Sequence, residues 1–173
     1  MRALDFWKAV TLDRIDLLEQ VVDMLRELGI SYCVVGGQAV NAYVEPLVSL
    51  DLDLVVAADR LETLESRLRA SFRVEEFPHR LNVSQTGSDL RIQVQTDPRY
   101  ARFLEGASQR EVLGAPMPVA AVDDVLQGKI WAVADEARRP SKRQKDLADI
   151  ARLIERFPHL RDRVPGDILG KLV

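Results

Sequence analysis

The sequence is poor in the residues that build disulfide frameworks and histidine–cysteine metal centres. It contains one cysteine, Cys33, and two histidines, His79 and His159, that stand far apart along the chain. A single cysteine rules out an internal disulfide and fits a reducing cytoplasm, where we expect the protein. Cys33 lies in an apolar run, so we expect it to be a small buried core residue. The separated histidines exclude a histidine–cysteine cluster with metal-ligand spacing.

Long apolar runs and a surplus of basic residues are missing as well. No run approaches the ~20 apolar residues of a membrane-spanning helix, and the charged start of the chain is unlike a signal peptide. The formal net charge is −3. A dedicated nucleic-acid-binding protein usually has a basic face, so this charge argues against that class and leaves room for a small basic patch. The composition, with 47% hydrophobic and 29% charged residues among 173, is that of an ordinary globular domain.

Hydrophobic periodicity predicts helices mixed with strands, followed by helices alone. Helices are expected at residues 11–28, 38–44, 59–70, 122–136 and 141–157, with a weaker helical tail over 158–173. Thr11 and Ser141 are the expected caps, and Gly29 the expected end of the first helix. Strands are expected at residues 30–35, 49–57, 71–77, 80–85 and 89–95, with a hairpin turn at 86–88. Residues 98–113 are ambiguous, and 111–119 suit a short edge strand or a loop.

This order of elements predicts an α/β (α+β) fold with a mixed sheet flanked by helices. We expect residues 1–120 to form the core. Residues 121–173 would form a C-terminal helical extension packed on it, so that the whole is one compact unit.

Two glycines separate the first predicted strand from the helix that follows it. Gly36 and Gly37 permit positive φ and a close approach of the backbone. The start of a helix offers unpaired N–H groups and a positive dipole end, which suit phosphate oxygens. The same pair also fits a tight turn that binds nothing, so both interpretations stay open at this point.

Two aspartates stand in the next predicted strand, where Asp51 and Asp53 alternate with leucines. Strand alternation places both carboxylates on one face, about 6.5–7 Å apart. Carboxylates in this arrangement can share a pair of Mg²⁺ ions that neutralise a triphosphate. The plain alternative is the solvated face of an antiparallel strand, although aspartate is a poor strand former.

Together these features resemble the nucleotidyltransferase superfamily, in its minimal polymerase-β-like form. The match is an apolar strand, Gly36-Gly37, about a dozen residues, and Asp51-x-Asp53 in a strand. It is similar above all to AbiEii-type and related small bacterial nucleotidyltransferases of toxin–antitoxin and phage-defence loci. Those commonly have Pro-Arg-x-Thr before the Asp-x-Asp, where this chain has Ser49 for the threonine and Leu47 for the arginine.

The C-terminal helices extend the resemblance. Such proteins often carry a lysine in one helix and Lys-Asp-x-x-Asp in the next, matched here by Lys129 and by Lys145, Asp146 and Asp149. The two aspartates share a helix face. The resemblance makes the two lysines candidates for phosphate contacts or for ion pairs that hold the tail against the sheet. The nucleotide-binding set that it implies is Gly36, Gly37, Ser49, Lys129 and Lys145.

The resemblance implies an Mg²⁺-dependent transfer of a nucleotide monophosphate from an NTP to a hydroxyl on RNA or protein. Asp51 and Asp53 would be metal ligands, and the position of the third acidic residue falls on Gln93. An amide is no base and binds Mg²⁺ more weakly than a carboxylate does. Asp89 and Asp97 flank that strand but stand ~13 Å from Gln93 along it.

Three function classes follow. The first is a working nucleotidyltransferase with Asp51, Asp53 and Gln93 at its catalytic centre. The second is a degenerate nucleotidyltransferase-fold protein that binds a nucleotide or serves as the partner-binding component of a two-gene system. The third is a structural or interaction protein, with Ile130, Trp131 and Val133 as an interface stripe, although core packing is the commoner use of such a stripe.

Overall fold

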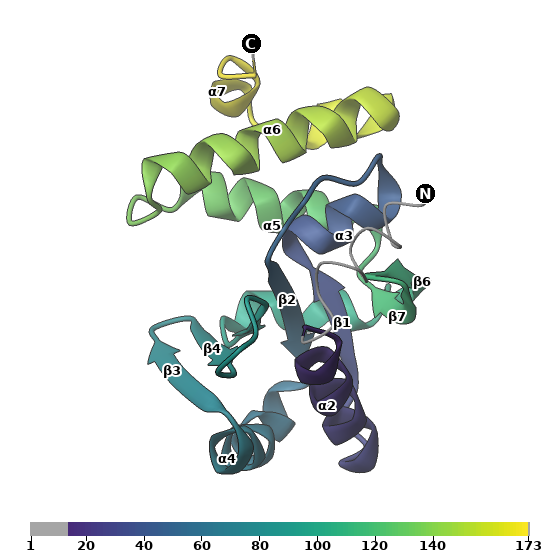
Figure 1. The fold of residues 1–173 in the computed structure, drawn as a ribbon. Coiled ribbons are helices and arrows are strands. Elements are labelled where there is room, and N and C mark those ends of the chain that lie inside the picture. The colour runs from purple at the N-terminus through teal and green to yellow at the C-terminus, as the bar shows by residue number, and fades with distance from the viewer. Residues whose placement is uncertain (1–13, 173) are drawn as a thin grey trace.

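A seven-stranded mixed sheet forms the centre of the computed structural model, which describes residues 14–172 (Figure 1). The strand order is β3-β4-β5-β2-β1-β7-β6. The strands are β1 Tyr32–Val35, β2 Asp51–Val56, β3 Arg73–Phe77, β4 Arg80–Ser84, β5 Arg91–Gln95, β6 Ser108–Val112 and β7 Ala115–Val119. Strand β2 runs antiparallel to β1 and parallel to β5. The predicted mixed sheet is therefore confirmed.

The helices lie at both ends of the sheet as Figure 1 shows it. They are α2 Arg14–Glu27, α3 Gly36–Tyr43, α4 Leu61–Ser71, α5 Val122–Ala134, α6 Pro140–Arg156 and α7 Gly166–Leu169, with 3₁₀ turns at Ala58–Arg60, Pro98–Leu104 and Pro158–Arg163. Helices α3, α5 and α6 contact one another at one end, and α2 and α4 lie together at the other. The C-terminal helices thus cover the region where β1 ends and β2 begins.

Strand β2 shows how the sequence pattern sets up both the core and the site. Leu52 and Leu54 are fully buried, while Asp51 and Asp53 project from the opposite face. Each buried leucine stabilises the fold by about 1.5–3 kcal/mol through removal of apolar surface from water. Leu126 of α5 and Ile150 of α6 belong to the same hydrophobic cluster as these strand residues. The C-terminal helices therefore share one core with the sheet.

The apolar stripe of α5 packs inward. Ile130 and Val133 are buried, and Trp131 stacks on Phe103 with ring centroids 5.6 Å apart. Tyr100 meets the same indole edge-on at 5.2 Å. These contacts are core packing, which is the commoner use of such a stripe.

Three local expectations need correction. Helix α3 begins at Gly36 rather than Gln38, so the two glycines form its first turn. The cap of α6 is Arg139, without a side-chain hydrogen bond, and Ser141 does not cap it. The segment near residues 111–119 is a hairpin in which β6 is the edge strand and β7 pairs with β1 through Val119. The expected cap Thr11 lies outside the described residues.

Other expectations hold. Cys33 is fully buried, and Gly29 ends α2 with a φ of +63°. Strands β4 and β5 form the expected antiparallel pair.

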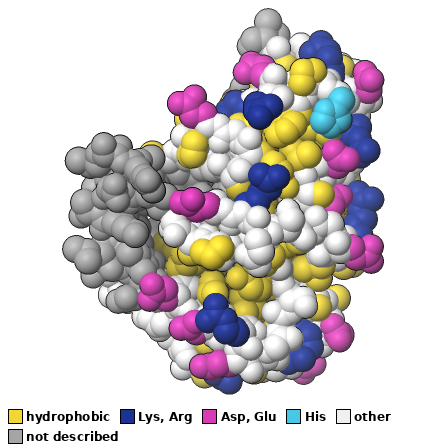
Figure 2. Space-filling view, turned by 90° about the vertical axis from the view of Figure 1, so that its right-hand side faces the viewer, with side chains coloured by type: hydrophobic (Ala, Val, Ile, Leu, Met, Phe, Trp, Pro, Cys, Tyr) yellow, Lys and Arg dark blue, Asp and Glu magenta, His cyan; other side chains and the backbone are white. Residues whose placement is uncertain are grey.

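Within residues 14–172, no helix has the length and apolar character needed to cross a bilayer. Seen from the side of β6 and β7, cationic and anionic side chains are interspersed over the described surface (Figure 2).

Candidate functional site

The turn from β1 into α3 lies directly against the Asp53 carboxylate. Gly36 has a φ of +69°, in the left-handed region that favours glycine. A methyl carbon built on Gly36 would lie 2.0 Å from Oδ2 of Asp53 and 2.9 Å from its Cγ. Backbone conformation and close approach therefore both require glycine at this position. The glycine allows the carboxylate to reach the amino-terminal end of α3.

The second glycine opens a space lined by two polar side chains. A Cβ on Gly37 would lie 3.7 Å from Oγ of Ser49 and 3.9 Å from Nζ of Lys145. Helix α3 is capped by Val35 without a side-chain hydrogen bond, so its first N–H groups have no side-chain cap. The structure thus brings Gly37, Ser49 and Lys145 together at a helix start.

Asp51 is held by two cationic side chains from different elements. Its Oδ1 lies 3.1 Å from Nε and from Nη2 of Arg91 in β5, and its Oδ2 lies 3.1 Å from Nζ of Lys142 in α6. Burial alone would raise the pKa of the Asp51 carboxyl, but hydrogen bonds and attraction from Lys142 and Arg91 hold that pKa below its ordinary value. The carboxylate is therefore ionised and charge-compensated.

Asp53 is in a different electrostatic environment. Its Oδ1 is buried and has no hydrogen-bond partner within the described part of the chain. Burial raises the pKa of the Asp53 carboxyl to about 6, and repulsion by Asp51 adds to the rise while attraction to Lys129 opposes it. An orphaned buried oxygen beside an ionised carboxylate is a place where a cation would be stabilised.

Gln93 lies next to Asp53 across the parallel pair of β2 and β5. The register pairs Asp53 with Gln93 and Asp51 with Arg91. In-register neighbours project from the same face of a sheet. The backbone register thus places the Gln93 amide beside the Asp53 carboxylate. Asp97 lies beyond the end of β5 and accepts hydrogen bonds from Arg99.

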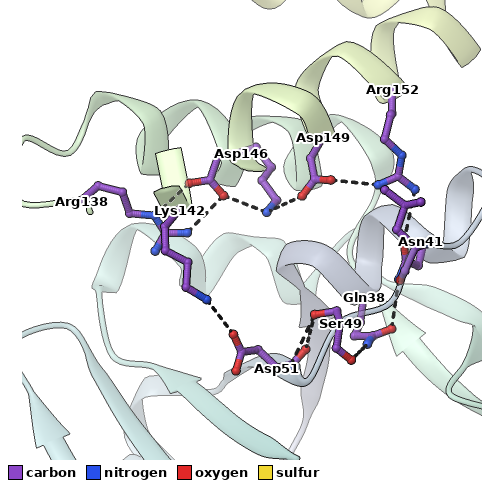
Figure 3. A network of polar contacts seen from close by, with 11 residues as sticks. Gln38, Asn41, Ser49, Asp51, Arg138, Lys142, Asp146, Asp149 and Arg152 are labelled. Atoms are coloured by element: carbon purple, nitrogen blue, oxygen red, sulfur yellow. Dashed lines mark hydrogen bonds and ion pairs between the residues drawn. The ribbon is translucent and has the colours of Figure 1, made fainter. Parts of the chain in front are cut away.

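The Lys129 ammonium is paired with two carboxylates of α6. Its side chain is 7% exposed, and its Nζ lies 3.0 Å from Oδ1 of Asp146 and 2.8 Å from Oδ2 of Asp149 (Figure 3). Burial alone would lower the pKa of the Lys129 ammonium, but the two carboxylates raise it, so the charge is kept. Lys129 was expected either to contact phosphate or to form an ion pair. The structure shows ion pairs, which link α5 to α6. We therefore leave Lys129 out of the phosphate contacts proposed below.

The α3–β2 connection, residues 44–50, is fastened at several points. Gln38 donates to the backbone oxygen of Ser49 at 3.0 Å, and the Asn41 side chain bonds both the N–H and the oxygen of Leu47. Arg152 of α6, itself bonded to Asp149, donates to the backbone oxygen of Glu45 (Figure 3). These hydrogen bonds stabilise the connection in a conformation that places Ser49 beside Gly37.

Ser49 and Leu47 show different consequences of departing from the family pattern. Ser49 is buried, and its Oγ bonds to the backbone of Asp51. Its hydroxyl thus joins the connection to the start of β2. Leu47 is 55% exposed, so the missing arginine removes a charge from a solvent-facing position.

Two residues of the site were missed from the sequence. Arg91 faces Asp51 only because of the register between β5 and β2. The amino-acid sequence alone does not reveal that register. Lys142 lies three residues before Lys145 on α6. That spacing puts both on one helix face, which was a signal for pairing them.

The residues present fit a divalent cation only in part. Asp51 and Asp53 offer carboxylate oxygens on one face, and Oδ1 of Asp53 lacks a partner. Both oxygens of Asp51, however, already contact cationic side chains, and Gln93 is uncharged. Among residues 14–172, no group of three or more His, Cys, Asp or Glu side chains could hold a metal ion. This donor set suits one divalent ion better than a pair.

Several solved structures share this architecture. The antibiotic-resistance factor ANT(2'')-Ia matches with a TM-score of 0.61 and 15% identity, over 88% of this chain and 91% of that one. The lincosamide antibiotic adenylyltransferase LnuA matches with a TM-score of 0.53 and 11% identity, over 79% of this chain and 95% of that one. An antigenic nucleotidyltransferase-like protein from Paracoccidioides brasiliensis matches with a TM-score of 0.52 and 18% identity, over 84% of this chain and 77% of that one.

These similarities establish the nucleotidyltransferase fold for this chain. No protein-family model matches the sequence, and no curated protein does. At such low sequence identity, the structural similarity shows the fold of this chain but does not identify its substrate.

Proposed function

We propose that the protein binds a nucleoside triphosphate where α3 begins and transfers its nucleotide monophosphate to an acceptor hydroxyl. The observation that carries this proposal is the contact between the Gly36 turn and Asp53, with Ser49 and Lys145 beside Gly37. It places groups suited to phosphate oxygens, from the Gly36-Gly37 turn, the segment before β2 and helix α6, next to the acidic strand β2, on a fold that an adenylyltransferase shares.

Different residues of the chain would bind the phosphate groups and the metal ion. The N–H groups at the start of α3, the Ser49 hydroxyl and the Lys145 ammonium would bind phosphate oxygens. Asp51 and Asp53 would hold Mg²⁺, with the Gln93 amide oxygen as a neutral ligand. The ion, when bound, supplies positive charge against the triphosphate and the leaving pyrophosphate. As the acceptor oxygen bonds to the α-phosphorus and pyrophosphate leaves, the proton of the acceptor hydroxyl would pass to solvent, since the Gln93 amide is no base.

The acceptor is proposed only as a class. The fold and the AbiEii-like features suggest a hydroxyl on RNA or protein, in a toxin–antitoxin or phage-defence setting. ANT(2'')-Ia and LnuA were solved with adenylyl-2"-tobramycin and with lincomycin, so a small hydroxylated molecule is a further acceptor to test. The mixed charges on the face in Figure 2 offer no broad basic area there for RNA.

A second candidate function is nucleotide binding without transfer. Two observations favour it: Gln93 beside Asp53, and the full engagement of the Asp51 carboxylate by Arg91 and Lys142. Such a protein would act as the nucleotide- or partner-binding component of a two-gene system.

Labelled nucleotides separate the two candidates. The protein is incubated with each NTP labelled at the α-phosphate, Mg²⁺, and RNA, protein or aminoglycoside acceptors. Transfer that Asp53→Asn abolishes supports the enzyme. Transfer that only Gln93→Asp creates supports the degenerate form. Transfer that survives Asp51→Ala/Asp53→Ala contradicts the assigned site.

A further inference from the structure

Each of the two oxygens of the Asp51 carboxylate contacts a cationic side chain. Arg91 reaches Oδ1 from β5, and Lys142 reaches Oδ2 from α6, 91 residues away along the chain. The ion pair between Asp51 and Lys142 is partly shielded from solvent, because the Asp51 side chain is 15% exposed and the Lys142 side chain is 35% exposed. Both cations come from rigid elements that the core holds in place.

The local charges do not match a two-ion site. Asp51 and Asp53 carry at most two negative charges, and Arg91 and Lys142 supply two positive ones. The position of a third carboxylate is an amide, Gln93. The first divalent ion would therefore enter a site that is already neutral, and a second would lie beside both that ion and the Lys142 ammonium.

We propose that the Lys142 ammonium takes the place of one divalent cation, so that the site binds a nucleoside triphosphate with a single metal ion. This inference rests on the proposed nucleotide site and adds its metal content and the residue that sets it. Arg91 is a positioning residue here, because it orients Asp51 through the opposite oxygen.

The placement of α6 supports this role. Lys142 and Lys145 are three residues apart, so their side chains lie on one face of the helix. Lys142 reaches the carboxylate of Asp51, and Lys145 lies near the Gly37 turn. The first turns of α6 thus extend two ammonium groups toward the two halves of the site. Lys142 remains partly exposed, so a phosphate oxygen can reach it.

The interlocked ion pairs of Figure 3 keep α6 in this position. Lys129 and Arg138 bind Asp146, and Lys129 and Arg152 bind Asp149, on the same helix as Lys142. With α6 held in this way, the Lys142 ammonium lies within reach of Asp51 and competes with any cation that approaches Oδ2.

Manganese titration followed by electron paramagnetic resonance tests the inference without nucleotide. Mn²⁺ alone is titrated into the full chain as wild type, Lys142→Gln and Lys142→Arg, with Lys171→Gln as a control that removes one exposed positive charge. Lys142→Gln should bind Mn²⁺ about tenfold tighter, because no ammonium competes for Asp51. Lys142→Arg and Lys171→Gln should match wild type. Equal affinities for wild type and Lys142→Gln, or no binding by either, overturn the inference.

A second titration counts ions with nucleotide present. The probes are the α,β-methylene analogues of the four common NTPs, which cannot be cleaved at the α-phosphate. Wild type should bind one Mn²⁺ per bound analogue, and the Lys142→Gln/Gln93→Asp double variant should bind two. Two Mn²⁺ in the wild type overturn the inference and leave the proposed nucleotide site intact. If no analogue binds under any condition, the proposed function fails, and the titration with Mn²⁺ alone still decides the role of Lys142.

Discussion

The backbone of Gly36 and the carboxylate of Asp53 are in contact, so closely that a methyl carbon on Gly36 would lie 2.0 Å from Oδ2. One end of β1 and the middle of β2 are thereby fixed to each other at the candidate site. The contact links two parts of the sequence motif that are 17 residues apart. It also makes the identity of residue 36 a test of the site's geometry.

Gly36→Ala should destabilise the protein more than an equivalent change at a glycine with free space. The variant meets left-handed strain and a clash with Asp53, which together should cost about 2–4 kcal/mol of unfolding free energy. Gly29→Ala is the matched control, because Gly29 has a φ of +63° and a Cβ added there would have nothing within 4 Å. Strain alone should cost the control about 1–2 kcal/mol. Urea unfolding measures both, and equal losses would contradict the close contact.

Asp53 should make stability depend on pH in the direction opposite to an ordinary salt-bridged acid. Its pKa in the folded chain is raised from 3.8 to about 6, so folding favours the protonated form. Stability from this group is complete below the unfolded pKa and is lost as pH rises through about 6. The loss should reach about 2–3 kcal/mol.

Asp53→Asn isolates this contribution, since the amide cannot ionise. We expect its stability relative to wild type to rise between pH 4 and pH 7, in urea unfolding with a metal chelator present. Curves that stay parallel across this range would show that the Asp53 carboxyl titrates normally.

Lys129→Met should be strongly destabilising. Removal of the buried ammonium leaves Asp146 and Asp149 close together without their shared counter-charge. Loss of one member of a buried ion pair costs about 3–5 kcal/mol. Thermal or urea unfolding measures the change. A loss below about 1 kcal/mol would mean that the network in Figure 3 contributes little to holding α6.

Lys145→Ala should behave in the opposite way. Lys145 is exposed, so its loss should change the unfolding free energy by less than about 0.5 kcal/mol. Its Nζ lies near Gly37, and NTP affinity should fall about tenfold with the loss of a charge-assisted phosphate contact. Lys171→Ala is the control for the loss of a positive charge elsewhere. If both variants bind NTP as wild type does, Lys145 is not a phosphate ligand.

The sheet and the acidic face were predictable because they depend on local pattern. Alternation of Leu52 and Leu54 with Asp51 and Asp53 fixes which side chains face the core. The β6–β7 hairpin was less accessible, since Pro116 and Pro118 cannot donate to a ladder and argue against a strand inside a sheet. Strand β7 nonetheless reaches β1 at Val119, beyond both prolines.

The charged side chains of the site were only partly predictable, because their partners are distant in sequence. The pattern selected Lys129 and Lys145 equally, and only packing shows that one is buried between aspartates and the other lies near Gly37. Arg91 acquires its role from a strand register, and Lys142 from the position of α6 over β2. Side-chain chemistry was thus visible in the sequence, whereas the assignment of each charge required the fold.

Calorimetric titration with NTPs is the decisive experiment, since the proposed function depends on a nucleotide bound at the start of α3. Each of the four common NTPs is titrated with Mg²⁺ into wild type and into Asp51→Ala/Asp53→Ala. We expect wild type to bind one NTP per chain. The affinity of the double variant for NTP should be lower by at least about tenfold. No binding by wild type, or equal binding by the two proteins, would show that the nucleotide site is wrongly assigned.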